Sequence, residues 1–184
     1  MEVMTGAIDR DPSGVIASAA AGDEVAFGRI VAEHHAEMHR VCVFVCGDQS
    51  IAEDAVQAAW SIAWKKLGSV REPDRLKPWL ISVAVNQARD LQRKRKRRAE
   101  LEVITDMPMQ GGGVDPATGI DAMDLRTALL ALKPEERELL GMRYIAGFNA
   151  TELSAALGIS PSGVRNRLER LTTRLRQELS LIHI

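Results

Sequence analysis

The chain has 184 residues, which suffices for one domain or two small ones, and 46% of them are hydrophobic while only 4% are aromatic. No run of about 18 apolar residues occurs and the N-terminus lacks a secretory layout, so we expect a cytoplasmic protein without membrane insertion. The net charge of -1 does not by itself indicate that the chain binds nucleic acid. The distribution of the charged residues does, because residues 93–98 form an unbroken basic run, RKRKRR.

The first predicted elements are a short helix over residues 13–21 and a long helix that begins after Asp23 and ends near Cys46. One face of the long helix carries a row of His35, His39, Cys42 and Cys46. Four side chains along about three turns cannot all reach one ion. Buried thiols are the simpler interpretation of the cysteines, and a metal or redox role for part of the row stays open.

The next predicted helix spans residues 50–67 and buries a face of small residues such as Ala55 and Ala59. A second face combines an acid and an amide with two tryptophans, namely Glu53, Gln57, Trp60 and Trp64. Core packing of the tryptophans and a protein-docking surface are both compatible with this pattern.

Residues 68–78 form a predicted loop with two prolines, and residues 79–98 form a helix that ends in the basic run. Residues 99–120 contain three consecutive glycines and two prolines in an acidic setting, which predicts a flexible linker and a domain boundary. The expected fold is therefore all-α, with helical domains at residues 13–98 and 121–178.

The second domain begins with a predicted helix over residues 121–132 and another that Pro134 opens and that ends near Gly147. Asn149 then caps a short helix that stops at Gly158, and Ser160 caps a longer one with Pro161 at its first position. This arrangement is typical of a helix-turn-helix, whose second helix enters the DNA major groove.

The candidate DNA-binding residues lie on the polar side of this second helix. They are Ser160, Ser162, Arg165, Asn166, Arg167 and Arg170. Arginine and asparagine side chains recognise base edges or phosphates. The alternative is an ordinary helical hairpin whose charged face is solvated.

Catalysis has no support in the sequence. The chain contains no P-loop, GxGxxG, HExxH, GxSxG or CxxC motif, and no stretch alternates long enough for a sheet. We therefore expect neither an enzyme nor a cofactor.

Three segments in this order resemble the extracytoplasmic-function group of bacterial RNA polymerase sigma factors, within the sigma-70 family. The segment AEDAVQAAWSIAWKKL is similar to region 2.2, PWLISVAVNQARDLQRKRKRR to regions 2.3 and 2.4, and the stretch from LKPEERELL to RLRQEL to region 4. The resemblance covers residues 13–178. Trp60 stands where the family commonly has phenylalanine.

The resemblance implies a function for each segment. It assigns polymerase docking to Asp54, Gln57, Trp60 and Ser61, and binding of the -10 element to Trp79, Asn86, Asp90 and Arg93. The helix-turn-helix is expected to read the -35 element. The loop at residues 68–78, with Asn86 and Asp90, is the candidate pocket for an extruded base. The implied partners are core RNA polymerase, promoter DNA and an anti-sigma factor.

Two other classes remain open at this point. A repressor or activator would use the helix-turn-helix without polymerase, which leaves residues 49–98 unexplained. An RNA-binding or metal-sensing regulator would rest on the basic run and the histidine and cysteine row alone.

Overall fold

The computed structural model describes residues 11–101, 125, 127–129 and 131–182. Within these residues the chain forms helices and no strand, which confirms the all-α prediction. The N-terminal group consists of α1 (Pro12–Ala20), α2 (Glu24–Cys46), α3 (Gln49–Lys66), the 3-10 turns η1 (Leu67–Ser69) and η2 (Pro73–Arg75), and α4 (Leu76–Leu101). The C-terminal group consists of α6 (Pro134–Leu140), the π-turn η3 (Gly141–Ile145), α7 (Ala150–Leu157) and α8 (Pro161–Ile182).

The ends of the helices follow from local side-chain chemistry. The Asp23 carboxylate accepts from the backbone amides of Val25 and Ala26, at 2.9 and 3.1 Å, and thereby caps α2. Gly47 ends α2 with a φ of 68°, a left-handed conformation that disfavours residues with a side chain. These boundaries agree with those predicted from the sequence.

The core of the N-terminal group is formed where α2, α3 and α4 pack together. The buried face of α3 consists of the small residues Ala52, Ala55, Val56, Ala59 and Ala63. Their size lets α2 and α4 approach α3 closely, and larger side chains such as Met38, Leu80 and Ile81 fill the remaining space.

Helix α4 begins earlier than the sequence indicated. Residues 68–78 were expected to form one loop, but α4 starts at Leu76 and includes Pro78 in its first turn. Proline is tolerated there because the first amides of a helix have no intrahelical acceptor. Helix α4 also continues to Leu101, while the rest of the predicted linker lies outside the described residues.

The C-terminal group differs from the prediction after Leu140. The helix that was expected from Pro134 to about Gly147 has nearly that extent, but its last part, η3 from Gly141 to Ile145, is a wider π-helix. The Phe148 amide donates to the Met142 carbonyl at 2.9 Å, and Gly147 adopts a φ of 75°. Of the predicted helix over residues 121–132, Leu125 and residues 127–129 are helical, and residues 121–124 lie outside the described residues.

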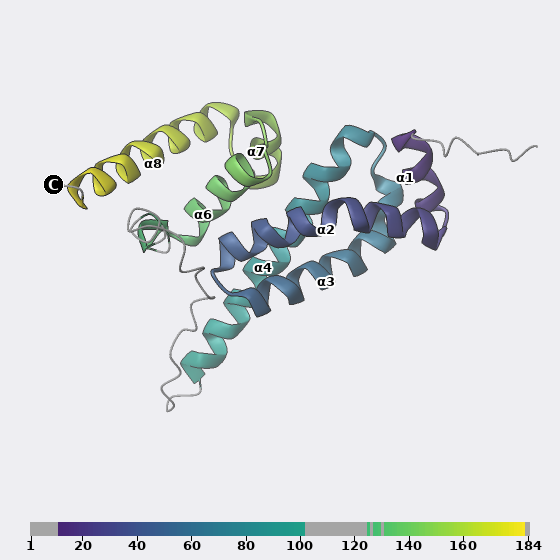
Figure 1. The fold of residues 1–184 in the computed structure, drawn as a ribbon, viewed down its shortest axis with the longest axis horizontal. Coiled ribbons are helices and arrows are strands. Elements are labelled where there is room, and N and C mark those ends of the chain that lie inside the picture. Colours follow the sequence, from purple (N-terminus) through teal and green to yellow (C-terminus); the bar gives the residue numbers. More distant parts are fainter. Residues whose placement is uncertain (1–10, 102–124, 126, 130, 183–184) are drawn as a thin grey trace, which may run out of the picture.

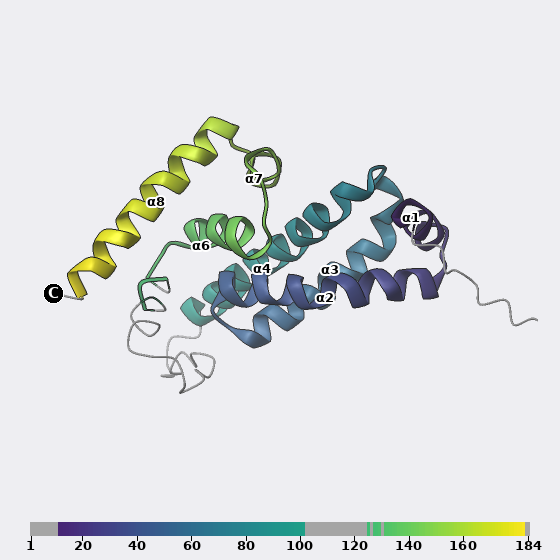
Figure 2. The same ribbon diagram turned by 45° about the horizontal axis from the view of Figure 1, so that its top comes forward.

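The two groups of helices contact each other. Both views show α6 between α7 and α8 on one side and the α2–α4 bundle on the other (Figures 1 and 2). The sequence pattern indicated two domains on either side of a linker and did not indicate this contact.

The cap of α7 provides a test of the local fold. Asn149 accepts from the amides of Thr151 and Glu152, and Glu152 accepts from the Asn149 amide at 2.7 Å. We expect Asn149→Ala to lower the free energy of unfolding by about 1 kcal/mol, as measured by urea unfolding. Thr151→Ala is the control, because this exposed side chain leaves the cap intact; equal effects of both changes would contradict the assignment.

Candidate nucleic-acid interface

The N-terminal end of α8 presents the polar residues that the sequence singled out for DNA binding. The Ser160 hydroxyl accepts from the Gly163 amide at 3.1 Å, so Ser160 caps the helix as predicted. Val164, Leu171 and Leu175 are buried and hold α8 against the rest of its group. The opposite side is exposed and carries Ser162, Arg165, Asn166, Arg167 and Arg170.

The turn before α8 is short and is held by two hydrogen bonds to Ser154. Gly158 ends α7 with a φ of 66°, and its amide donates to the Ser154 carbonyl at 3.0 Å. The Ser154 hydroxyl donates to the Ile159 carbonyl at 2.6 Å. The orientation of α8 relative to α7 is therefore fixed by local bonds, which is what a helix that reads a groove requires.

A second polar surface lies along α4. Residues 7, 11 and 14 positions after Trp79 fall on one face of a helix, and these are Asn86, Asp90 and Arg93. Asn86, Asp90 and Arg93 are exposed, and Trp79 is half-buried. The four residues expected to bind the -10 element therefore share one stripe.

Basic residues of both groups meet at a cavity of about 600 Å³ between α4 and the C-terminal helices. Its charged lining comprises Arg89, Arg93, Arg167, Arg170 and Arg174 together with Glu135, Glu136 and Glu138. Two ion pairs neutralise part of the charge of this lining. Arg174 pairs with Glu136 at 2.8 Å, and Arg89 pairs with Glu138. The sequence did not indicate that Arg93 and Arg167 would lie at one cavity.

The pair between Arg89 and Glu138 is the most enclosed ion pair among the described residues. Arg89 donates through Nε to Glu138 Oε1 at 2.7 Å and through Nη2 to Oε2. The side chain of Glu138 is only 2% exposed, and its carboxylate raises the pKa of Arg89 above its usual value. Removal of one partner from a buried pair typically costs about 3–5 kcal/mol because a charge is left uncompensated.

The exposed face of α3 carries the residues that were expected to dock on a protein. Asp54, Gln57 and Ser61 are exposed, and the indole of Trp60 donates to His35 Nδ1 at 3.2 Å. Trp60 and Trp64 both meet the ring of Phe27 edge-on, with centroids 5.8 and 4.8 Å apart. Trp64 is 40% exposed and lies at the surface, whereas Trp60 and Phe27 are partly buried and pack against the core.

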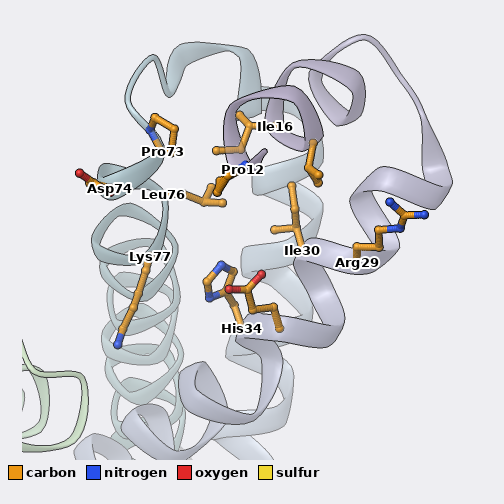
Figure 3. A pocket seen from close by; sticks show the side chains of 11 residues that line it. Pro12, Ile16, Arg29, Ile30, His34, Pro73, Asp74, Leu76 and Lys77 are labelled. Atoms are coloured by element: carbon orange, nitrogen blue, oxygen red, sulfur yellow. The ribbon is translucent and has the colours of Figure 1, made fainter. Parts of the chain in front are cut away.

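A further cavity of about 910 Å³ lies where α1 and α2 face the start of α4 (Figure 3). It is lined by Pro73, Asp74, Leu76 and Lys77 from the predicted pocket loop, but by neither Asn86 nor Asp90. His34 of α2 lies against the same space (Figure 3), and its neighbour Glu33 also lines it. The sequence did not single out these two residues.

The cysteines of the histidine and cysteine row are buried free thiols, as the simpler interpretation predicted. Burial raises the pKa of both Cys42 and Cys46 to about 12, which leaves them protonated and unreactive. His35 and His39 stack at 6.4 Å between ring centroids. Among the described residues no group of three potential ligands is placed to hold a metal ion, and no helix could span a membrane.

Comparisons with known proteins agree with this arrangement. The family model for Sigma-70 region 2 matches residues 30–98, and that for Sigma-70 region 4 matches residues 122–177. The chain belongs to the sigma-70 family, in its extracytoplasmic-function group. The matched regions divide the chain as the two groups of helices do, so we call these groups region 2 and region 4.

Relatives of this sigma-70 family chain cover most of its length. It is 30% identical to the "Probable RNA polymerase sigma factor RfaY" of Xanthomonas campestris over 88% of the chain, but spans only 42% of that relative. It is 26% identical to the ECF RNA polymerase sigma factor SigM of Mycobacterium tuberculosis, over 95% of this chain and 88% of SigM.

A solved structure also resembles this family member along nearly its whole length. CnrH of Cupriavidus metallidurans, in complex with the cytosolic domain of CnrY, matches with a TM-score of 0.64 and 27% identity. The match covers 94% of this chain and 97% of CnrH. Sigma factors are generally non-enzymatic DNA-binding regulators.

His34 yields a prediction on pH. Burial lowers its pKa from 6.5, Lys77 lowers it further, and the nearby Glu33 and Glu37 oppose this shift. Just below pH 6.5 the unfolded chain therefore binds a proton at His34 that the folded chain does not. The free energy of unfolding consequently decreases as the pH is lowered through this window. We expect His34→Gln to flatten the dependence of the unfolding free energy on pH below 6.5, measured by urea titrations. An unchanged slope would show that other groups cause it.

Proposed function

We propose that this chain is a sigma factor that binds core RNA polymerase and directs promoter-specific initiation of transcription. The observation that supports the proposal is that three exposed polar surfaces, two suited to nucleic acid and one suited to a protein partner, lie on separate helices of a single chain. These are the exposed N-terminal end of α8, the stripe on α4 and the outer face of α3. A repressor would need only the first of them.

Each surface fits one step of initiation. The basic end of α8 suits the major groove of the -35 duplex. The stripe of Trp79, Asn86, Asp90 and Arg93 combines an aromatic ring with polar groups, which suits the unpaired bases and backbone of the -10 strand. The exposed acid and amide of α3 lie beside exposed tryptophan, a composition typical of protein interfaces.

The chain itself supplies no catalysis in this proposal, because the polymerase carries the chemistry. It acts in the cytoplasm, where core polymerase is found. CnrH has been solved in complex with the cytosolic domain of CnrY, so we also propose an anti-sigma partner that covers the binding surfaces of this chain.

Run-off transcription with core enzyme on a promoter library tests the function directly. Transcripts that start from one class of promoter only in the presence of the chain are expected. A chain that binds duplex DNA but neither binds core enzyme nor starts transcripts would be a repressor or activator instead.

The first prediction here concerns α8. Arg165→Ala is expected to weaken binding of the full chain to a promoter duplex recovered in that screen by about 1–3 kcal/mol if Arg165 reads a base. Fluorescence anisotropy measures the affinity. Lys133→Ala removes the same charge from an exposed position outside α8 and is expected to have little effect. Equal losses in both variants would mean that only overall charge matters.

The second prediction separates polymerase docking from DNA opening. Asp54 and Gln57 are exposed and not part of the core, so changing both to Ala should alter stability by no more than about 0.5 kcal/mol per site. Affinity for core polymerase, measured by fluorescence titration, should fall because the partner loses hydrogen bonds on a desolvated surface.

Asn86→Ala is the contrasting variant, since Asn86 is exposed on α4 and not on α3. It should bind core polymerase normally and fail to open the -10 region in permanganate footprinting. If the Asp54 and Gln57 double variant bound core polymerase as well as the unchanged chain, the α3 face would not be the docking surface.

A further inference from the structure

The indole of Trp60 on α3 is held by two side chains of α2. Its Nε1 donates to Nδ1 of His35 at 3.2 Å, and the ring of Phe27 meets the indole ring edge-on, with centroids 5.8 Å apart. His35 and Trp60 are 25 positions apart in the sequence, and the packing of α2 on α3 brings them together. A side chain of the α3 docking face therefore takes its orientation from α2.

The direction of this hydrogen bond follows from the chemistry of the two rings. An indole N–H can only donate, so Nδ1 of His35 must accept and carries no proton. The neutral imidazole then has its proton on Nε2. His35 is exposed, so its Nε2–H is left at the surface as a donor beside the indole.

The ring of His35 is itself held in place by its neighbour one turn further along α2. His35 and His39 stack with their ring planes 6° apart and their centroids 6.4 Å apart. His39 is half-buried, and its Nε2 has no hydrogen-bond partner. His39 thus supports His35 by stacking alone, and the bond to Trp60 involves only His35.

Trp64, the second tryptophan of this cluster, lacks such an acceptor. Its ring packs edge-on against the same Phe27, with centroids 4.8 Å apart, and it is 40% exposed. No described residue accepts from its indole N–H. In the free chain water satisfies an exposed donor of this kind, but a donor that a partner covers without an acceptor loses that water and weakens binding. Trp60 avoids this loss because His35 accepts from it.

We propose that His35 is a positioning residue for docking on core polymerase. It fixes the indole of Trp60 next to Gln57, three positions earlier on α3, and keeps the indole N–H satisfied when the partner covers this face. The docking surface thereby extends from α3 onto α2. This inference rests on the proposed sigma-factor function, but the pair itself can be observed in the free chain.

The indole Nε1–H signals in an NMR spectrum of isotope-labelled chain report the pair directly. The chain has three tryptophans, and Trp60→Phe assigns one signal by deleting it. His35→Phe keeps an aromatic ring against His39 but removes the acceptor, so the Trp60 signal should shift and exchange faster with water. His35→Asn places Oδ1 where Nδ1 lies and should leave the signal nearly unchanged. An unmoved signal in His35→Phe would overturn the pair.

The affinity for core polymerase, measured by fluorescence titration of dye-labelled chain, tests the positioning role. His35→Phe should weaken binding about fivefold, because the covered indole N–H loses its acceptor. His35→Asn should bind like the unchanged chain. His39→Phe is the matched control, since the same change one turn away retains stacking and removes no bond to Trp60, so its affinity should be unchanged. A loss in His35→Asn with none in His35→Phe would overturn the proposal.

A double-mutant cycle separates the hydrogen bond from general effects on the surface. Trp60→Phe has no N–H to satisfy, so adding His35→Phe to it should weaken binding no further. An equal loss from His35→Phe in both backgrounds would overturn the positioning role. Circular dichroism checks that each variant keeps its helices. If the unchanged chain does not bind core polymerase, the proposed function fails and the docking role with it, whereas the indole signals still show whether the pair forms.

Discussion

Close packing of α2 and α4 against the small residues of α3 is the constraint on which the rest of the molecule depends. Ala55, Ala59 and Ala63 are completely buried, so neither neighbouring helix is held at a distance by a large side chain. Each helix of the bundle therefore has an outer face that does not pack in the core. The outer face of α3 carries Asp54 and Gln57, and that of α4 carries Asn86 and Asp90. Near the end of α2, Phe44 contacts Gly141 of region 4.

Features that depend on neighbouring residues were predictable from the sequence. Asp23, Asn149 and Ser160 cap helices by bonds to amides two or three residues away, and Gly47 and Gly158 end helices by their own backbone conformation. The exposed residues of α8 were equally predictable, because the helical period alone places Arg165 and Arg170 opposite the buried Val164 and Leu171.

Features that depend on distant residues were not predictable. Arg89 and Glu138 are 49 positions apart, and neither belongs to a motif that marks it as a partner of the other. The π-turn after Leu140 lies where Gly141 approaches Phe44, a contact that no local pattern encodes. Whether Trp60 and Trp64 were core or surface also depended on another helix, since their rings pack on Phe27 of α2.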